Sequence, residues 1–210
     1  MTLQQIGRIT GTDKGNAGSH TFEGMSYLDV YASYLDGLRE SVRTVLELGV
    51  ARGGSLKMWR DYFPNAQIWG VDIDPDAMLD YGPRVCTVLG SQADPAVIAQ
   101  VAPGQEFDLV VDDGSHLVEH LTGSLRLIWP RIRSGGLYVM EDLAGTWNCD
   151  MTYTKVQWPG QGRNSPQTDY LNKREPFQAV VDEHIQAMDG LRGQTRFVHF
   201  WPMQCFLKKV

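Results

Sequence analysis

The chain has 210 residues, enough for one domain that buries a hydrophobic core without the help of disulfide bonds. Hydrophobic residues make up 42% and charged residues 21%, which is ordinary for a soluble globular protein. The formal net charge of −6 argues against a general nucleic-acid binder, and no apolar run is long enough for a membrane helix. The three cysteines are widely spaced and the polar N-terminus lacks the apolar stretch of a signal peptide, so the sequence predicts a cytoplasmic protein with reduced thiols.

Apolar runs of strand length alternate with helical patterns along most of the chain. The segment 1–24 is rich in Gly, Thr and Ser and is predicted to form a loop or arm laid over the domain, and apolar residues at helical spacing predict a helix over 25–40. Five strands are then predicted, at 44–49, 67–72, 85–89, 107–112 and 136–141. Helices are predicted after the first four strands, at 55–62, from about 75, from about 94 and at 116–130. This alternation is typical of a doubly wound α/β fold, in which a parallel sheet is covered on both faces.

The C-terminal part of the chain follows a different pattern. The segment 144–175 has little periodicity and is long for a connector, so it is predicted to be a lid or substrate-binding loop, with an oligomer contact as the alternative. Its aromatic side chains could stack on a sugar or polyketide ring: Trp147, Tyr153, Trp158 and Tyr170. A helix near 177–188 and two strands at 196–201 and 204–208 follow, and the strands are predicted to form an antiparallel edge hairpin. The result is a mostly parallel sheet of seven strands in a single domain over 1–210.

A glycine-rich loop follows the first predicted strand. Gly49, Gly53 and Gly54 let the backbone turn tightly and approach a ligand closely. Asp72 ends the second strand about 20 residues further on, where a carboxylate accepts hydrogen bonds from a ribose. The loop lacks the G-x-G-x-x-G pattern of dinucleotide sites, and the carboxylate of Glu47 would repel a pyrophosphate but suits a cationic ligand. The charge therefore favours S-adenosylmethionine over NAD as the cofactor.

Acidic residues follow the fourth and fifth predicted strands. Asp112 and Asp113 come after the fourth strand and Glu141 and Asp142 after the fifth, and these strands are expected to be neighbours. Four adjacent carboxylates repel one another, and a hard divalent cation such as Mg²⁺ or Mn²⁺ is the usual relief. Such a cation would bind an acceptor hydroxyl and lower its pKa, and a neutral His116 close by could take the proton.

Other interpretations of these residues stay open. Asp113 or Ser115 is also a plausible helix N-cap, which is a purely structural role. The run 116–120 spells the H-x-x-E-H pattern of some zinc proteases, but it lies directly after a buried strand and two carboxylates. The alternative functions are a metal-dependent methyltransferase acting on catechols or other vicinal diols, an NAD-dependent enzyme, and a non-catalytic scaffold with a degenerate nucleotide pocket.

Six stretches spread along the chain carry a family resemblance: 11–15, 46–50, 55–64, 70–73, 111–116 and 135–143. In these stretches the chain resembles the metal-dependent sugar O-methyltransferases of antibiotic biosynthesis, the macrolide (mycinamicin and tylosin type) and rhamnosyl tetracenomycin group. The resemblance implies a class I methyltransferase fold with S-adenosylmethionine and Mg²⁺ (or Mn²⁺) as cofactors. It implies a sugar hydroxyl on a glycosylated natural product as the acceptor, and it is compatible with a homo-oligomer.

The resemblance also assigns roles to individual residues. It implies Asp113, Glu141 and Asp142 as metal ligands, and His116 as the catalytic base acting beside Asp113. Cofactor contacts are expected from the N-terminal arm, the glycine loop, the strand ends and the turn after the third strand: Thr12, Lys14, Glu47, Gly49, Ser55, Asp72, Ser91, Gln92 and Asp112.

Overall fold

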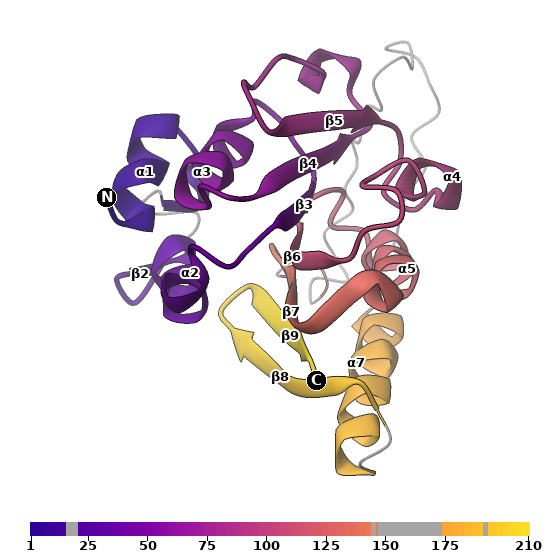
Figure 1. The fold of residues 1–210 in the computed structure, drawn as a ribbon. Coiled ribbons are helices and arrows are strands. Elements are labelled where there is room, and N and C mark those ends of the chain that lie inside the picture. Colours follow the sequence, from indigo (N-terminus) through magenta and orange to yellow (C-terminus); the bar gives the residue numbers. More distant parts are fainter. Residues whose placement is uncertain (16–20, 144–145, 147–173, 191–192) are drawn as a thin grey trace, which may run out of the picture.

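The computed structural model describes residues 1–15, 21–143, 146, 174–190 and 193–210, which form a central sheet with helices on both faces (Figure 1). The seven strands lie in the order β5-β4-β3-β6-β7-β9-β8, and a separate two-stranded hairpin, β1-β2, precedes α2. All neighbours from β5 to β7 are parallel, whereas β9 is antiparallel to both β7 and β8. The strand bounds are β1 (Thr21–Phe22), β2 (Met25–Ser26), β3 (Thr44–Leu48), β4 (Gln67–Asp72), β5 (Val85–Leu89), β6 (Phe107–Asp112), β7 (Ile132–Met140), β8 (Thr195–Trp201) and β9 (Gln204–Lys209).

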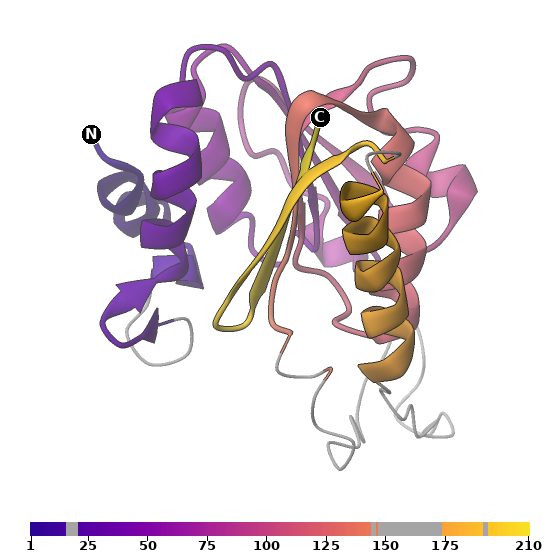
Figure 2. The ribbon, with the colours of Figure 1, turned by 90° about the horizontal axis from the view of Figure 1, so that it is seen from below.

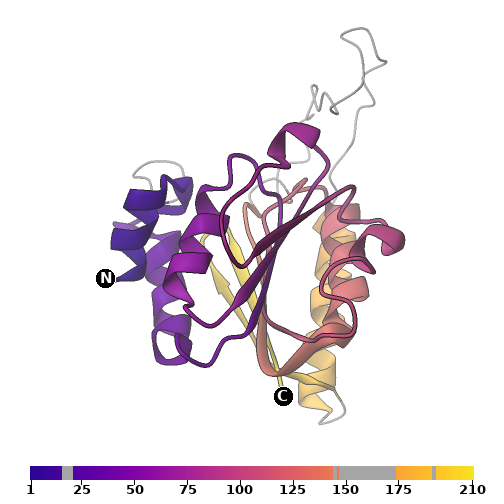
Figure 3. The same cartoon turned by 45° about the horizontal axis from the view of Figure 1, so that its top comes forward.

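The helices form two layers around this sheet (Figures 2 and 3). One layer contains α1 (Leu3–Thr10), α2 (Tyr27–Leu35) and α3 (Gly54–Tyr62), and the other contains α4 (Pro95–Ile98), α5 (Val118–Ile128) and α7 (Arg174–Asp189). Short 3₁₀ turns complete the described chain: η1 (Asp13–Gly15), η2 (Asp36–Leu38), η3 (Pro75–Ala77) and η4 (Trp129–Arg131). No helix in the described ranges is long and apolar enough to cross a membrane.

The two central strands explain why the sheet is covered on both faces. Every residue of β3 and of β6 is buried. Because successive side chains of a strand point to opposite faces, Leu109 and Val111 enter the core under α2 and α3, whereas Val110 enters the core under α5. The continuous apolar runs in the sequence are therefore strands with two buried faces.

The predicted sheet is confirmed, including its mostly parallel order and its antiparallel C-terminal hairpin. The fourth and fifth predicted strands are the neighbours β6 and β7, as the argument for the acidic rim requires. The predicted loop 144–175 and its aromatic residues lie almost wholly outside the described residues.

Two local predictions are wrong. The first residues form a helix and not a loop, because Thr2 and Gln5 form a capping box at the start of α1, and Leu3 and Ile6 bury one face of this helix. The helix predicted from about 75 is only the 3₁₀ turn η3, because the backbone leaves the helical region at Met78, which has φ −88° and ψ 66°.

Candidate active site

A cavity of about 550 Å³ opens where β3, β4, β6 and β7 end. Its volume lies within the range of small-molecule sites, and its position is where ligands of doubly wound sheets bind. The lining comes from the N-terminal segment and from the loops after these four strands: Gly11, Thr12, Asp13, Gly49, Val50, Ala51, Arg52, Gly54, Ser55, Asp72, Asp113, Gly114, His116 and Asp142.

The loop after β3 needs glycine at its first position. Gly49 has φ +89°, and a Cβ atom there would lie 2.1 Å from the carbonyl oxygen of Asp113. At the start of α3, a Cβ atom on Gly54 would lie 2.9 Å from the backbone nitrogen of Thr12. The absence of these side chains lets the loop after β6 and the N-terminal segment approach the loop after β3, and the three together enclose one side of the cavity.

Asp72 holds the same loop in place. Its Oδ2 atom accepts hydrogen bonds from the backbone amides of Val50 at 2.7 Å and Ala51 at 3.0 Å, and its Oδ1 atom accepts one from Asp74 at 2.9 Å. The carboxylate lines the cavity as well. Asp72 therefore joins the end of β4 to the glycine loop at the position where the sequence predicts a ribose contact.

The side chain of Lys14 lies in the middle of the acidic residues. It is only 1% exposed, and its Nζ atom contacts the carboxylate of Asp113, Glu141 Oε2 at 2.6 Å and Glu47 Oε1 at 3.3 Å. Burial opposes the charge of this ammonium, but the three carboxylates more than compensate and hold the Lys14 pKa well above its usual value. The structure thus makes Lys14, predicted to lie near the cofactor, a buried counter-ion that fastens η1 to the ends of three strands.

The two glutamates of this cluster are fully buried. Burial raises the pKa of Glu47 to about 7 and that of Glu141 to about 8, although the charge of Lys14 opposes both shifts. Tyr31, in α2, donates a hydrogen bond to Glu141 Oε1. The Glu141 carboxylate is therefore held between an ammonium and a phenol, behind the residues that line the cavity.

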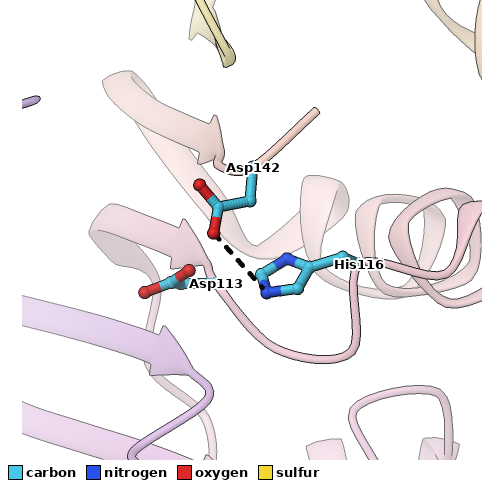
Figure 4. Close-up of side chains that lie close together, drawn as sticks. All are labelled: Asp113, His116 and Asp142. Atoms are coloured by element: carbon cyan, nitrogen blue, oxygen red, sulfur yellow. Dashed lines mark ion pairs between the residues drawn. The ribbon is translucent and has the colours of Figure 1, made fainter. Parts of the chain in front are cut away.

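Three side chains face one another at the edge of the cavity (Figure 4). Asp113, His116 and Asp142 are half-buried. Each has one potential ligand atom, and the three atoms lie within 4.8 Å of one another. His116 Nε2 is 3.8 Å from Asp142 Oδ2, and the hydroxyl of Tyr27 donates a hydrogen bond of 2.8 Å to Asp142 Oδ1. These three residues, from the loops after β6 and β7, form the potential metal-binding group found in the described part of the chain.

The backbone is strained at two of these three residues. His116 has φ +55° and Asp142 has φ +54°, in the left-handed region that non-glycine residues rarely occupy. Such a conformation costs about 1–3 kcal/mol and is concentrated at functional sites. Five other non-glycine residues of the described chain also have a positive φ, so this conformation fits the tight turns after β6 and β7 and does not by itself mark a function.

Asp112 and Gln92 lie behind the cavity lining. Asp112 is fully buried and accepts hydrogen bonds from Gln92 Nε2 at 2.8 Å, Ser124 Oγ at 2.5 Å and the Tyr138 hydroxyl at 2.8 Å. Gln92 Oε1 accepts a bond of 2.8 Å from the backbone amide of Ser115. In the structure, both residues support the loop after β6, and their predicted contact with a cofactor stays a prediction.

The remaining predicted residues divide between the cavity and its surroundings. Thr12, Gly49, Ser55 and Asp72 line the cavity, whereas Ser91 does not, and its hydroxyl accepts a hydrogen bond from the amide of Ala93. Tyr27 and Tyr31 were missed as site residues. Their helical spacing marks them only as core residues of α2, and nothing in the sequence shows that their hydroxyls end at Asp142 and Glu141.

The chain is similar to curated sugar O-methyltransferases. No family model matches. It is 42% identical over 125 residues to the 8-demethyl-8-(2-methoxy-alpha-L-rhamnosyl)-tetracenomycin-C 3'-O-methyltransferase of Streptomyces olivaceus, covering 56% of this chain and 32% of that protein. It is 34% identical over 197 residues to the L-olivosyl-oleandolide 3-O-methyltransferase of Streptomyces antibioticus, covering 87% of this chain and 42% of that protein. This chain is a relative of antibiotic sugar O-methyltransferases.

A solved structure of MycE, a methyltransferase of mycinamycin biosynthesis in complex with Mg and SAH, is similar over 100% of this chain and 55% of the other, at 28% identity and a TM-score of 0.74. The predicted resemblance and the class I methyltransferase fold are confirmed by these relatives. The SAH-bound methyltransferase PaMTH1 of Podospora anserina, at 15% identity and a TM-score of 0.57, shares the fold alone. The chain spans about a third to two fifths of the length of the curated relatives that it matches.

Proposed function

We propose that this protein transfers a methyl group from S-adenosylmethionine to a sugar hydroxyl of a glycosylated natural product, with the help of a divalent cation. The observation that carries the proposal is the cavity at the strand ends. One side of it is a glycine loop with Asp72, and the other side is the half-buried group Asp113, His116 and Asp142. Relatives that are named as sugar O-methyltransferases supply the class of acceptor.

The cavity suits S-adenosylmethionine better than a dinucleotide. Acidic side chains stand at the ends of β4, β6 and β7 and line the cavity: Asp72, Asp113 and Asp142. These negative charges attract the sulfonium and ammonium groups of S-adenosylmethionine and would repel a pyrophosphate. The missing side chain of Gly49 lets the backbone of Asp113 pack against this loop, so the loops after β3 and β6 form one continuous wall for the cofactor.

The acidic group suits a hard divalent cation. Asp113 and Asp142 offer carboxylate oxygens at the cavity edge, and oxygen ligands are those that Mg²⁺ and Mn²⁺ prefer. We assign Asp113 and Asp142 to the metal. Glu141 is proposed as a third ligand on the resemblance alone, because its carboxylate lies behind the lining and is held by Lys14 and Tyr31. When bound, the cation would supply the positive charge that lowers the pKa of an acceptor hydroxyl.

His116 is proposed to take the proton from that hydroxyl. In the transfer, the bond from sulfur to the methyl carbon breaks and a bond from the acceptor oxygen to this carbon forms. The acceptor proton goes to an imidazole nitrogen and S-adenosylhomocysteine leaves. The imidazole lies at the cavity edge, and Asp142, 3.8 Å from Nε2, would stabilise the imidazolium that results.

The proposed function is tested with glycosides as acceptors. Isothermal titration should show binding of S-adenosylhomocysteine but not of NAD, because the acidic lining disfavours a pyrophosphate. Methyl transfer to a glycoside should stop in EDTA and return with Mg²⁺. Full activity in EDTA would remove the metal from the reaction, and binding of NAD alone would contradict the choice of cofactor.

His116→Ala should lower the rate of methyl transfer by about 10²–10⁴-fold if the imidazole is the general base. The same variant also distinguishes a role of His116 as general base from a role as metal ligand. The measurement is Mn²⁺ binding by electron paramagnetic resonance without substrate. A base leaves the Mn²⁺ affinity nearly unchanged, whereas a ligand lowers it together with the rate. A matched control is His199→Ala, because His199 lies in β8 and does not line the cavity. Wild-type turnover in the His116 variant would contradict both roles.

A further inference from the structure

A hydrophobic groove lies beside the candidate active site. Two cavities, of about 590 Å³ and about 270 Å³, share part of their walls. The shared residues come from the β1-β2 hairpin and from the turn between β8 and β9: Phe22, Trp201, Pro202 and Met203. Both hairpins lie at the end of the molecule where β7 ends (Figure 2), so two parts of the chain far apart in sequence form one continuous groove.

Three large apolar side chains are exposed in the walls of the groove. Phe22 is 57% exposed, Met25 is 43% exposed and Phe200 is 49% exposed, and all three lie in its walls. A group of large exposed apolar side chains in a concave surface marks a binding site more often than a single exposed one does. The groove is therefore suited to a ligand with a large apolar surface.

Two contacts join the groove to the acidic residues. Met203 accepts a backbone hydrogen bond of 3.0 Å from the amide of Leu143, the residue after Asp142. Tyr27 lines the smaller cavity, and its hydroxyl donates to Asp142 Oδ1 at 2.8 Å. Among the described residues, the groove and the acidic cavity share no lining residue, but Tyr27 and Leu143 in the groove walls directly contact or adjoin Asp142.

The charged residues of the groove lie at its margins. Glu23 belongs to the tip of the β1-β2 hairpin. The guanidinium of Arg174 lies 4.3 Å from the centre of the Phe177 ring and donates a hydrogen bond to Thr146, so its charge is engaged by the protein itself. The walls between these two residues can bury apolar surface without leaving a charge unpaired.

We propose that this groove binds the hydrophobic aglycone of the acceptor glycoside, while its sugar hydroxyl reaches Asp113 and Asp142. The assignment rests on the proposed function and adds the part of the substrate that the acidic site does not recognise. An acceptor of this class has a polar end and a large apolar body. The surface next to the acidic residues has the same division, with carboxylates on one side and Phe22, Met25 and Trp201 on the other.

The test uses a double variant, Phe22→Ser with Met25→Ser. Both side chains are exposed, so the change should spare the fold. The matched control is Ile9→Ser with Val210→Ser, two exposed apolar residues outside the groove and the acidic cavity. The probes are two glycosides that appear in the names of related methyltransferases, 8-demethyl-8-alpha-L-rhamnosyl tetracenomycin C and demethylmacrocin. Methyl α-L-rhamnoside serves as the sugar without an apolar aglycone. Binding is measured by titration with S-adenosylhomocysteine and Mg²⁺ present.

Consider a glycoside that the wild-type protein methylates. The Kd of the groove variant for this glycoside should be at least about tenfold higher than that of the wild type, because apolar contact area is lost. The KM of the groove variant should rise accordingly. Its affinities for methyl α-L-rhamnoside and S-adenosylhomocysteine should not change, and the control variant should resemble the wild type. Wild-type Kd and KM in the groove variant, or an equal loss in the control, would overturn the assignment and leave the proposed function standing. If the wild-type protein neither binds nor methylates either glycoside, the proposed acceptor class fails and the groove assignment with it.

Discussion

Asp142→Asn is expected to lower methyl transfer by at least about 10³-fold, because it removes a negative charge from the proposed metal site. Asparagine has the size of aspartate and tolerates the left-handed conformation that Asp142 adopts at φ +54°. Its amide oxygen can still accept the hydrogen bond from Tyr27. The fold should therefore survive, and the Kd for S-adenosylhomocysteine should rise far less than the rate falls, because the carboxylates of Asp72 and Asp113 still line the cavity.

The control for this variant is Asp76→Asn, which removes an exposed carboxylate of η3 outside the cavity lining. It should leave the rate of methyl transfer and the Kd unchanged. Steady-state kinetics and titration calorimetry provide the two measurements. If Asp142→Asn loses cofactor binding to the same degree as activity, Asp142 acts on the shape of the cavity and the metal assignment is wrong.

Lys14→Met should lower the free energy of unfolding by about 3–5 kcal/mol, the usual cost of removing one partner from a buried ion network. The variant removes the only ammonium that contacts Glu47, Asp113 and Glu141 within the described residues, and Glu47 and Glu141 are fully buried. Methionine fills a similar volume, so the loss measures charge and hydrogen bonding more than packing. Denaturant unfolding in EDTA gives the value, because a bound cation would replace part of the lost charge.

A second substitution separates this effect from a general packing defect. Lys14→Met combined with Glu141→Gln removes one of the buried acids that Lys14 pairs with, and should recover about 1–3 kcal/mol of the loss. Lys57→Met, in α3 and only partly buried, is the matched lysine control and should change stability by less than about 0.5 kcal/mol. If the double variant is no more stable than Lys14→Met, the carboxylates do not depend on Lys14 for their charge balance.

The arrangement of the strands was predictable because local sequence patterns carry it. A strand buried on both faces is mostly apolar, as β3 and β6 are apart from Thr44, Glu47, Asp108 and Asp112. Parallel strands require long connections, so the order of apolar runs and helices indicates the sheet. The position of Asp113 and Asp142 on one rim follows from the same rule, since both come directly after adjacent parallel strands.

The helix α1 is indicated by the spacing of Leu3 and Ile6 after the cap at Thr2, whereas the Gly-, Thr- and Ser-rich composition of the whole segment 1–24 favours a loop. The role of Lys14 is a different case. Its contacts join residues more than thirty positions apart in the chain, and no local pattern reports the burial of a single lysine. The same holds for Tyr27 and Tyr31, whose spacing is that of any core residues of a helix.

The sequence by itself therefore determined the strands, their parallel arrangement and the acidic rim, because these depend on short-range periodicity and on the geometry of strand connections. Only the tertiary structure decided which acids share a lysine, which of them face the cavity, and that two distant hairpins form one apolar groove. These features depend on how separate elements pack together in three dimensions. The free energy of a buried charge or an exposed ring depends on spatial neighbours that are distant in the sequence.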